Sequence, residues 1–241
     1  MTREVMQRYN FPHPLRKGHI IMVKSGILLI DKPQMITSHD VVDIVRRKLN
    51  LRRVGHAGTL DPLATGLLII LVDRATKQFN RFADFDKGYT ACLKLGVGTD
   101  SGDSQGKIIA ESGYSGVTRE NVEAALKSLE GKIENVPPMV SALKHKGKRL
   151  YKLARQGITV ERKGRPVEIH SLELLKFSLP DIEFEVRCSK GTYIRSLAEE
   201  IAKRLNCVGH ISEIRRVSVG PYLVAQAKAV DDFNENDIRP A

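Results

Sequence analysis

Residues 55–66 read Gly-His-Ala-Gly-Thr-Leu-Asp-Pro-Leu-Ala-Thr-Gly, a glycine-rich stretch whose one carboxylate is Asp61. Glycine lets a backbone turn tightly or approach a ligand closely, and Pro62 restricts the chain just after the acid. The stretch therefore predicts a loop that presents a single acid. Asp followed by Pro is also typical of a helix start, with Asp61 as the N-cap, and spacing alone leaves that alternative open.

The composition limits the class of protein. A chain of 241 residues, 41% of them hydrophobic, is long enough for one large domain or two small ones with a proper core. Cys92, Cys188 and Cys207 lie far apart, so neither a disulfide framework nor a thiolate metal site is indicated. No histidine pair has ligand spacing either. We therefore expect no metal, and a reducing, cytoplasmic location.

No stretch of the sequence has the character of a membrane segment. The longest apolar run, Leu67–Val72, is far shorter than the ~20 residues that span a bilayer. Residues 1–24 carry scattered charges without a central apolar block, so they do not resemble a secretory signal. We expect them to form a basic, disordered extension, and Met22 is an alternative start.

The net charge of +11, with a pI of about 9.6, favours a polyanionic partner. Lysine and arginine neutralise phosphates and release counterions, so nucleic acid is the natural candidate. Each cluster alone is also typical of a solvated surface, but several occur next to glycine-rich loops. The clusters are Arg46-Arg47-Lys48, Arg52-Arg53, Lys144 to Arg155, Arg162 to Arg165 and Arg215-Arg216.

Hydrophobic periodicity predicts strands and helices that interleave without the regular alternation of a doubly wound sheet. We therefore predict an α+β fold with a mixed, largely antiparallel central sheet and flanking helices. A helix at 75–83 is expected to carry Phe79 and Phe82 inward. The other expected elements are strands at 27–30, 67–72, 89–95 and 182–188, a helix capped by Thr37 or Ser38, and helices at 118–131, 149–156 and 194–205.

Two further patterns suggest ligands but are better explained without them. Residues 99–103 read Thr-Asp-Ser-Gly-Asp, yet the later glutamate of an EF-hand is missing, so we predict a plain turn. Lys190-Gly191-Thr192 lacks the upstream glycine and the residue order of a nucleotide-binding loop. Neither calcium nor a nucleotide is expected.

Several long motifs occur in an order that resembles the TruB-type tRNA pseudouridine synthases. The likeness extends from Gly26 to about Tyr222. It implies a pseudouridine synthase catalytic domain at 25–223 and a tail at 224–241, too short for the RNA-binding PUA module of many members. The motifs stand at 26–33 (GILLIDKP), 53–66 (RVGHAGTLDPLATG), 75–77 (ATK), 141–144 (SALK) and 188–196 (CSKGTYIRS).

This resemblance implies an activity and a substrate. The expected reaction converts uridine to pseudouridine at position 55 in the T loop of tRNA, with no cofactor and no metal. The enzyme would recognise the shape of the T arm more than a long base sequence. We expect a monomer.

The resemblance also assigns catalytic roles. Asp61 would attack C1′ or stabilise its developing positive charge, and both a sugar adduct and a glycal route remain open. Arg195 matches the family's partner arginine and would lower the pKa of Asp61 if the two groups meet. Tyr89 matches the tyrosine that stacks on the target base and helps remove the proton from C5.

Further residues match the part of the family's site that binds the RNA. The target uridine has to be turned out of the T loop, and His56 matches the residue that enters the vacated space. Tyr193 is expected in the same pocket. Lys32, Lys77 and Lys144 are expected to contact the RNA backbone or the pocket.

The chain departs from the family pattern at two turns, and two other functions stay open. The family usually has glycine where Met35 stands, and again near Asp73, so these turns are expected to differ. An rRNA- or guide-directed synthase is one alternative, which Leu63-Ala64 after Asp-Pro disfavours. A non-catalytic RNA chaperone is the other, and it would not need Asp61.

Overall fold

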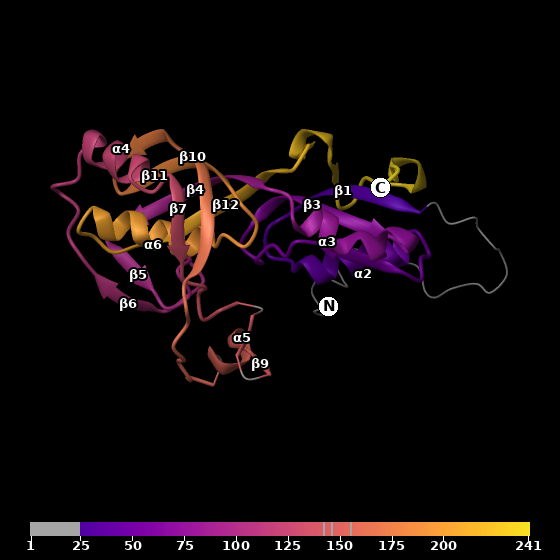
Figure 1. The fold of residues 1–241 in the computed structure, drawn as a ribbon, viewed down its shortest axis with the longest axis horizontal. Helices are drawn as coiled ribbons and strands as arrows, with labels where there is room; N and C mark the ends of the chain where they lie inside the picture. Colours follow the sequence, from indigo (N-terminus) through magenta and orange to yellow (C-terminus); the bar gives the residue numbers. More distant parts are fainter. Residues whose placement is uncertain (1–24, 142, 146, 155) are drawn as a thin grey trace. The chain divides into compact units, whose positions relative to one another are not determined.

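The computed structural model describes residues 25–241 except 142, 146 and 155, so the expected extension at 1–24 lies outside the described residues. The described chain divides into two compact units (Figure 1). The first contains residues 25–87 and 215–241, and the second contains residues 88–214. Within these residues no helix is long and apolar enough to span a membrane. The domain boundaries at 25–223 and 224–241 stay a prediction.

The first unit is built on a sheet whose central strand, β3 (Thr65–Val72), is buried along almost its whole length. β1 (Gly26–Lys32) pairs antiparallel with it on one side. On the other side β2 (Val54–Ala57) pairs with its end and β12 (Gly209–Val219) with its beginning. Because β1 and β3 are apolar on both faces, helices have to cover both. The short strands β13 (Tyr222–Leu223) and β14 (Lys228–Ala229) pair with β12 and β1.

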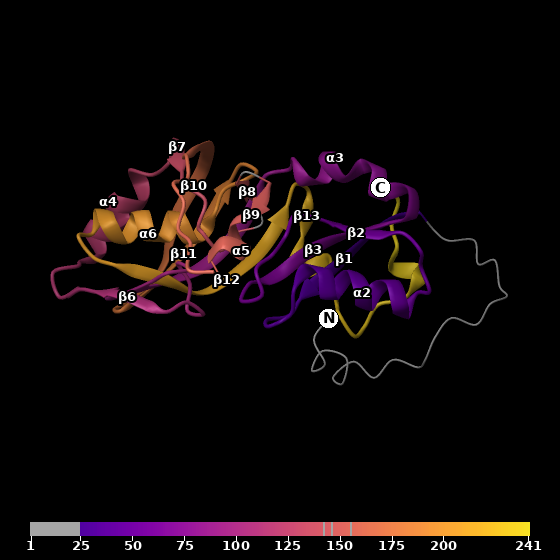
Figure 2. The same ribbon diagram turned by 90° about the horizontal axis from the view of Figure 1, so that it is seen from below.

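Two helices cover the opposite faces of this sheet (Figure 2). α2 (Ser38–Lys48) begins as predicted, because the side chain of Thr37 accepts from the backbone N–H of Asp40 and Asp40 bonds back to Thr37. On the other face α3 (Phe79–Ala83) inserts Phe82 into the core formed by alternate residues of β1 and β3.

The helix predicted at 75–83 is only partly present. A 3₁₀ helix, η1 (Asp73–Gln78), precedes the short α3. Phe82 is fully buried, but Phe79 is 47% exposed, so the prediction that Phe79 points inward is wrong. A helix of little more than one turn can pack only one or two side chains against the sheet. In α3 that side chain is Phe82, and Phe79, at the first position, lies outside the buried face.

The second unit has its own run of paired strands, in the order β12-β4-β11-β10-β7. The strands predicted at 89–95 and 182–188 are confirmed as β4 (Lys87–Leu95) and β11 (Asp181–Cys188). β10 (Arg165–Ser178) and β7 (Gly131–Asn135) were not predicted. Gly131 therefore begins a strand and does not end a helix. α4 (Arg119–Lys127) packs beside α6 (Ile194–Arg204).

Smaller elements complete both units, and most of the strand pairings are antiparallel. The predicted α+β class with a largely antiparallel sheet is therefore confirmed. The helix expected at 149–156 is present over a shorter range. The remaining elements are β5 (Val97–Thr99), β6 (Ile108–Glu111), β8 (Lys144–His145), β9 (Lys148–Arg149), α5 (Leu150–Ala154), η2 (Val224–Gln226) and η3 (Glu235–Asp237).

Candidate active site

The segment that carries Asp61 is a short loop between two strands. β2 ends at Ala57 and β3 begins at Thr65, so the loop predicted at 55–66 narrows to residues 58–64. No helix begins at Asp61, which rules out the helix-start alternative. Gly66 has a φ of 102°, and a Cβ there would lie 2.3 Å from the carbonyl oxygen of Arg216. Only glycine fits this position.

Asp61 is partly exposed, and hydrogen bonds to the backbone of Leu60 and Pro62 fix the residues on both sides of it. The hydroxyl of Ser38 accepts from the N–H of Leu60 at 2.8 Å and donates to its carbonyl at 3.1 Å. The N–H of Met35 donates to the carbonyl of Pro62 at 2.7 Å. The segment just after β1 therefore holds the loop from both ends.

Lys32 at the end of β1 is fully buried. Its Nζ donates to the carbonyls of Ile36 at 2.8 Å, Pro33 at 2.9 Å and Pro62 at 3.4 Å. The pKa of Lys32 is lowered to about 8, mainly by burial; the negative charge of Asp61 opposes this shift, and the positive charge of Arg216 adds to it. Lys32 thus braces the loop and remains an ammonium near the carboxylate at neutral pH. The RNA contact predicted for it stays a prediction.

Arg216 on β12 is a second buried cation beneath the same loop, with 1% of its surface exposed. Its Nε donates to the carbonyl of Leu67 at 2.7 Å, and its Nη2 donates to that of Gly58 at 3.1 Å. The sequence showed Arg215-Arg216 only as a basic pair. Arg215 makes a partly exposed ion pair with Asp31, at 2.6 Å and 3.0 Å. No sequence signal separated the buried arginine of this pair from the partly exposed one.

His56 lies on β2 and is partly exposed. Burial lowers its pKa, and the positive charges of Arg216 and His39 act in the same direction. The imidazole is therefore neutral at physiological pH, and its Nδ1 has no hydrogen-bond partner in the described part of the chain. Lys77, the other residue of this unit predicted to bind substrate, is exposed on η1.

In the second unit, Arg195 lies on α6 and is 4% exposed. Its two Nη atoms donate to the carbonyls of Ser101 at 2.7 Å and Val140 at 2.8 Å, and Asp103 is 3.4 Å from Nη1. Asp103 is itself held by the hydroxyl of Ser101 at 2.7 Å and the N–H of Gln105 at 3.1 Å. The turn predicted at 99–103 is present, and it clamps the guanidinium. Sequence reasoning missed that role.

The two predicted tyrosines also belong to the second unit. Tyr193 is the N-cap of α6, and the side chain of Asn135 binds both its N–H, at 2.8 Å, and its carbonyl, at 3.3 Å. Asn135, at the end of β7, is buried and was not predicted. Tyr89 is buried on β4, and Lys144 lies on β8. The predicted site residues therefore fall into two sets: Asp61, His56, Lys32 and Lys77 in the first unit, and Arg195, Tyr89, Tyr193 and Lys144 in the second.

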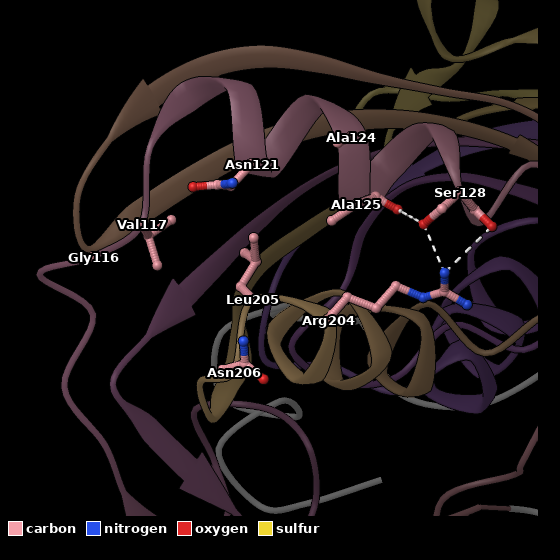
Figure 3. A pocket seen from close by; sticks show the side chains of 9 residues that line it. All are labelled: Gly116, Val117, Asn121, Ala124, Ala125, Ser128, Arg204, Leu205 and Asn206. Carbon is pink, nitrogen blue, oxygen red and sulfur yellow. Dashed lines mark hydrogen bonds between the residues drawn. The ribbon is translucent and has the colours of Figure 1, made fainter.

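A cavity of about 450 Å³ lies between α4 and α6, but none of the predicted site residues lines it (Figure 3). Nη1 of Arg204 donates to Oγ of Ser128 at 2.7 Å, and that hydroxyl donates to the carbonyl of Ala125. These groups satisfy one another and join the ends of the two helices. Across the described ranges, no cluster of three or more His, Cys, Asp or Glu side chains has the arrangement of a metal site.

Comparison with known proteins identifies the family. Residues 46–194, which include Asp61, Tyr89 and Tyr193, match the N-terminal domain of the TruB family of pseudouridylate synthases. The chain belongs to the TruB family. Among its curated relatives is the tRNA pseudouridine synthase B of Aromatoleum aromaticum, 48% identical over 87% of this chain and 68% of the relative. That of Opitutus terrae is 43% identical over 86% of both chains.

A solved structure shares the fold of this TruB-family chain. It is a Cbf5-Nop10-Gar1 complex, matched with a TM-score of 0.68 and 29% identity over 86% of this chain. The chain spans about half of the matched chain in that complex, 53% of its length. The likeness therefore supports the pseudouridine synthase fold, and identity is higher to the tRNA pseudouridine synthases.

Proposed function

We propose that this chain isomerises uridine to pseudouridine at position 55 in the T loop of tRNA. The observation that carries the proposal is the family match, which includes the loop with Asp61. The chain is also 48% identical to a tRNA pseudouridine synthase B. Identity is 48% to a tRNA pseudouridine synthase B and 29% to the matched chain of the Cbf5 complex, and this difference supports tRNA as the substrate.

The proposed reaction exchanges one glycosidic bond for another. Asp61 acts on the ribose as an anion, the bond between C1′ and N1 breaks, and the detached uracil turns. C5 then bonds to C1′, the proton on C5 leaves, and N1 takes up a proton. A sugar adduct and a glycal intermediate both agree with an anionic Asp61. Attraction between its carboxylate and the ammonium of Lys32 favours the anion, because Asp61 also raises the pKa of Lys32.

The other predicted residues act on the same nucleotide in this proposal. Arg195 stabilises the anionic form of Asp61, and Tyr89 stacks on the base and helps remove the C5 proton. Tyr193 packs in the base pocket. His56, uncharged because its pKa is lowered, enters the space that the flipped nucleotide leaves. Lys77 and Lys144 contact the RNA backbone or the pocket.

The substrate and state of the enzyme complete the proposal. We expect it to recognise the shape of the T arm, to act as a monomer and to work in the cytoplasm. The net charge of +11 supports a nucleic-acid substrate. It agrees equally with a tRNA-folding chaperone, and catalysis separates the two functions.

The experiment follows tritium release from a T-arm hairpin labelled at C5 of its uridines. The wild-type protein should release tritium, and Asp61→Asn should lower the rate by at least about 10³-fold with the hairpin Kd within threefold. Asp232→Asn, a change at an exposed carboxylate of the same unit, is the matched control and should keep the wild-type rate. Release by Asp61→Asn at the wild-type rate would refute the catalytic role, and no release by the wild type would favour the chaperone.

A further inference from the structure

The first unit carries a cluster of exposed cations that the reaction does not use. We name it the α2-end surface; it consists of Arg47, Lys48, Arg52, Arg53 and Arg74. Arg47 and Lys48 belong to the last turn of α2, and Arg52 and Arg53 lie in the connection to β2. The N–H of Asp73 donates to the carbonyl of Arg53 at 2.8 Å, which brings the start of η1, with Arg74, to the same place.

These side chains are all exposed, and no salt bridge joins them to any carboxylate of the described chain. Their neighbour Arg46 differs, because it pairs with Asp43, so it is not part of the surface. Lys48 donates to the backbone carbonyl of Asp231 and lies 4.4 Å from the centre of the Phe233 ring, contacts that orient the ammonium without neutralising it.

Local structure explains only part of this cluster. The negative end of the helix dipole favours the cations in the last turn of α2. Arg52, Arg53 and Arg74 lie outside the helix, so its dipole does not account for them. Unneutralised like charges repel one another, and together they create a positive potential that attracts phosphates. The surface therefore has the chemistry of a contact with a polyanion.

The position of the surface separates it from the chemistry at Asp61. β3 begins at Thr65, directly after the Asp61 loop, and ends at Val72, next to the bond between Asp73 and Arg53. At roughly 3.3 Å per residue the strand spans about 23 Å. The α2-end surface is therefore too far away to touch a nucleotide that reacts at Asp61.

We propose that the α2-end surface binds the phosphodiester backbone of the tRNA about one strand length from the target uridine. The inference rests on the proposed function, and it names a second contact with the same substrate. The contact adds affinity, and the reacting nucleotide is unaffected because the surface lies at the opposite end of β3.

The test compares two triple variants that remove the same amount of charge. Arg47→Gln/Arg52→Gln/Arg53→Gln removes cations of the α2-end surface. Arg119→Gln/Lys127→Gln/Lys176→Gln, the control, removes exposed cations that each pair with a glutamate. The Kd for whole tRNA is measured between 50 and 200 mM salt. The surface variant should bind about 10- to 100-fold more weakly, and the slope of log Kd against log salt should fall by about 2 to 3.

The control variant should bind within twofold of wild type, and both variants should keep the wild-type kcat at saturating tRNA. Thermal unfolding verifies that both are folded. Repeating the titration with the T-arm hairpin shows which phosphates the surface contacts. If the surface variant loses affinity for both RNAs, the phosphates belong to the T arm; if it loses affinity for whole tRNA alone, they lie elsewhere in the tRNA. Equal Kd and slope for the two variants would overturn the inference. Wild-type protein without tritium release would refute the proposed function instead.

Discussion

Asp61 and Arg195 are held in place in opposite ways. Around Asp61, the supporting side chains Ser38, Lys32 and Arg216 bond to the backbone of the neighbouring residues. Around Arg195, the support binds the functional side chain itself, through two backbone carbonyls and the carboxylate of Asp103. Asp61 is positioned by bonds that fix the backbone of its loop, and Arg195 is positioned by bonds to its guanidinium.

The difference separates stability from activity. Removing a group that bonds the Asp61 loop leaves buried carbonyls without donors, so the free energy of unfolding of the first unit should fall. Removing a group that bonds Arg195 leaves the backbone in place and frees one side chain, so the rate should fall more than the stability. The predictions below test this contrast.

The largest expected effect is on stability, in Arg216→Met. The variant removes the buried guanidinium that donates to the carbonyls of Leu67 and Gly58, and unfolding should become about 3 kcal/mol easier. The matched control is Arg215→Met on the same strand, which loses a partly exposed ion pair with Asp31 and a 3.4 Å bond to the hydroxyl of Thr65, and should cost at most about 1 kcal/mol. Chemical denaturation measures both, and equal losses would contradict the role given to Arg216.

The next prediction concerns pH. The pKa of Lys32 is about 8 in the folded protein against an ordinary 10.5, so between these values the unfolded chain binds a proton that the folded chain does not. Stability therefore rises with pH across that window, by up to about 3 kcal/mol, and below pH 8 this contribution is constant. The free energy of unfolding of wild type is compared with that of Lys32→Met, which lacks the group. Parallel pH profiles would show that Lys32 keeps an ordinary pKa.

Asp103→Asn tests the second region. The variant keeps the carbonyl bonds of Arg195 but weakens the ion pair that orients it, so kcat for tritium release should fall about 10- to 100-fold. Asp100→Asn is the control, because that exposed carboxylate accepts from the N–H of Lys107 in the same turn and is not the carboxylate that pairs with Arg195. A Tm drop without a rate effect would mean that Asp103 supports the fold alone.

The smallest effect is expected at Met35. Its φ is 70°, a left-handed conformation that favours glycine, and its side chain is 65% exposed. Met35→Gly should therefore stabilise the protein by about 0.5 to 1 kcal/mol, the relief of strain being partly offset by the flexibility of glycine when unfolded. A lower Tm for the variant would show that the methionine side chain has contacts that outweigh the strain.

Local patterns in the sequence predicted the parts of this fold that depend on interactions between residues close together in the chain. The buried strand at 67–72, the helix cap at Thr37 or Ser38 and the alternating strand at 89–95 follow from hydrophobic period and capping chemistry. All three are present, with Thr37 as the cap. Met35 and Asp73, at or near positions where the family usually has glycine, both have a positive φ, the conformation that glycine favours. That these turns differ from those of the family stays a prediction.

Long-range partners could not be predicted in the same way. Arg216 bonds to Gly58 across more than 150 residues, and Asn135 bonds to Tyr193 across 58. A basic pair and a single asparagine carry no mark of such distant acceptors. The turn at 99–103 was correctly predicted as a turn, but its bond to Arg195 depends on the packing of α6. The catalytic and RNA-binding roles of individual residues were implied by the family resemblance and stay predictions.

The first unit is discontinuous along the chain, and this sets the order in which it can be completed during synthesis. β1 forms early, yet it pairs with β14, and Ile27 exchanges backbone hydrogen bonds with Arg239. Arg216, the donor beneath the Asp61 loop, is also made late. A ribosome therefore has to release the far end of the chain before the early strands find their last partners. During synthesis, the loop that carries Asp61 lacks the bond from Arg216 until translation has passed that residue.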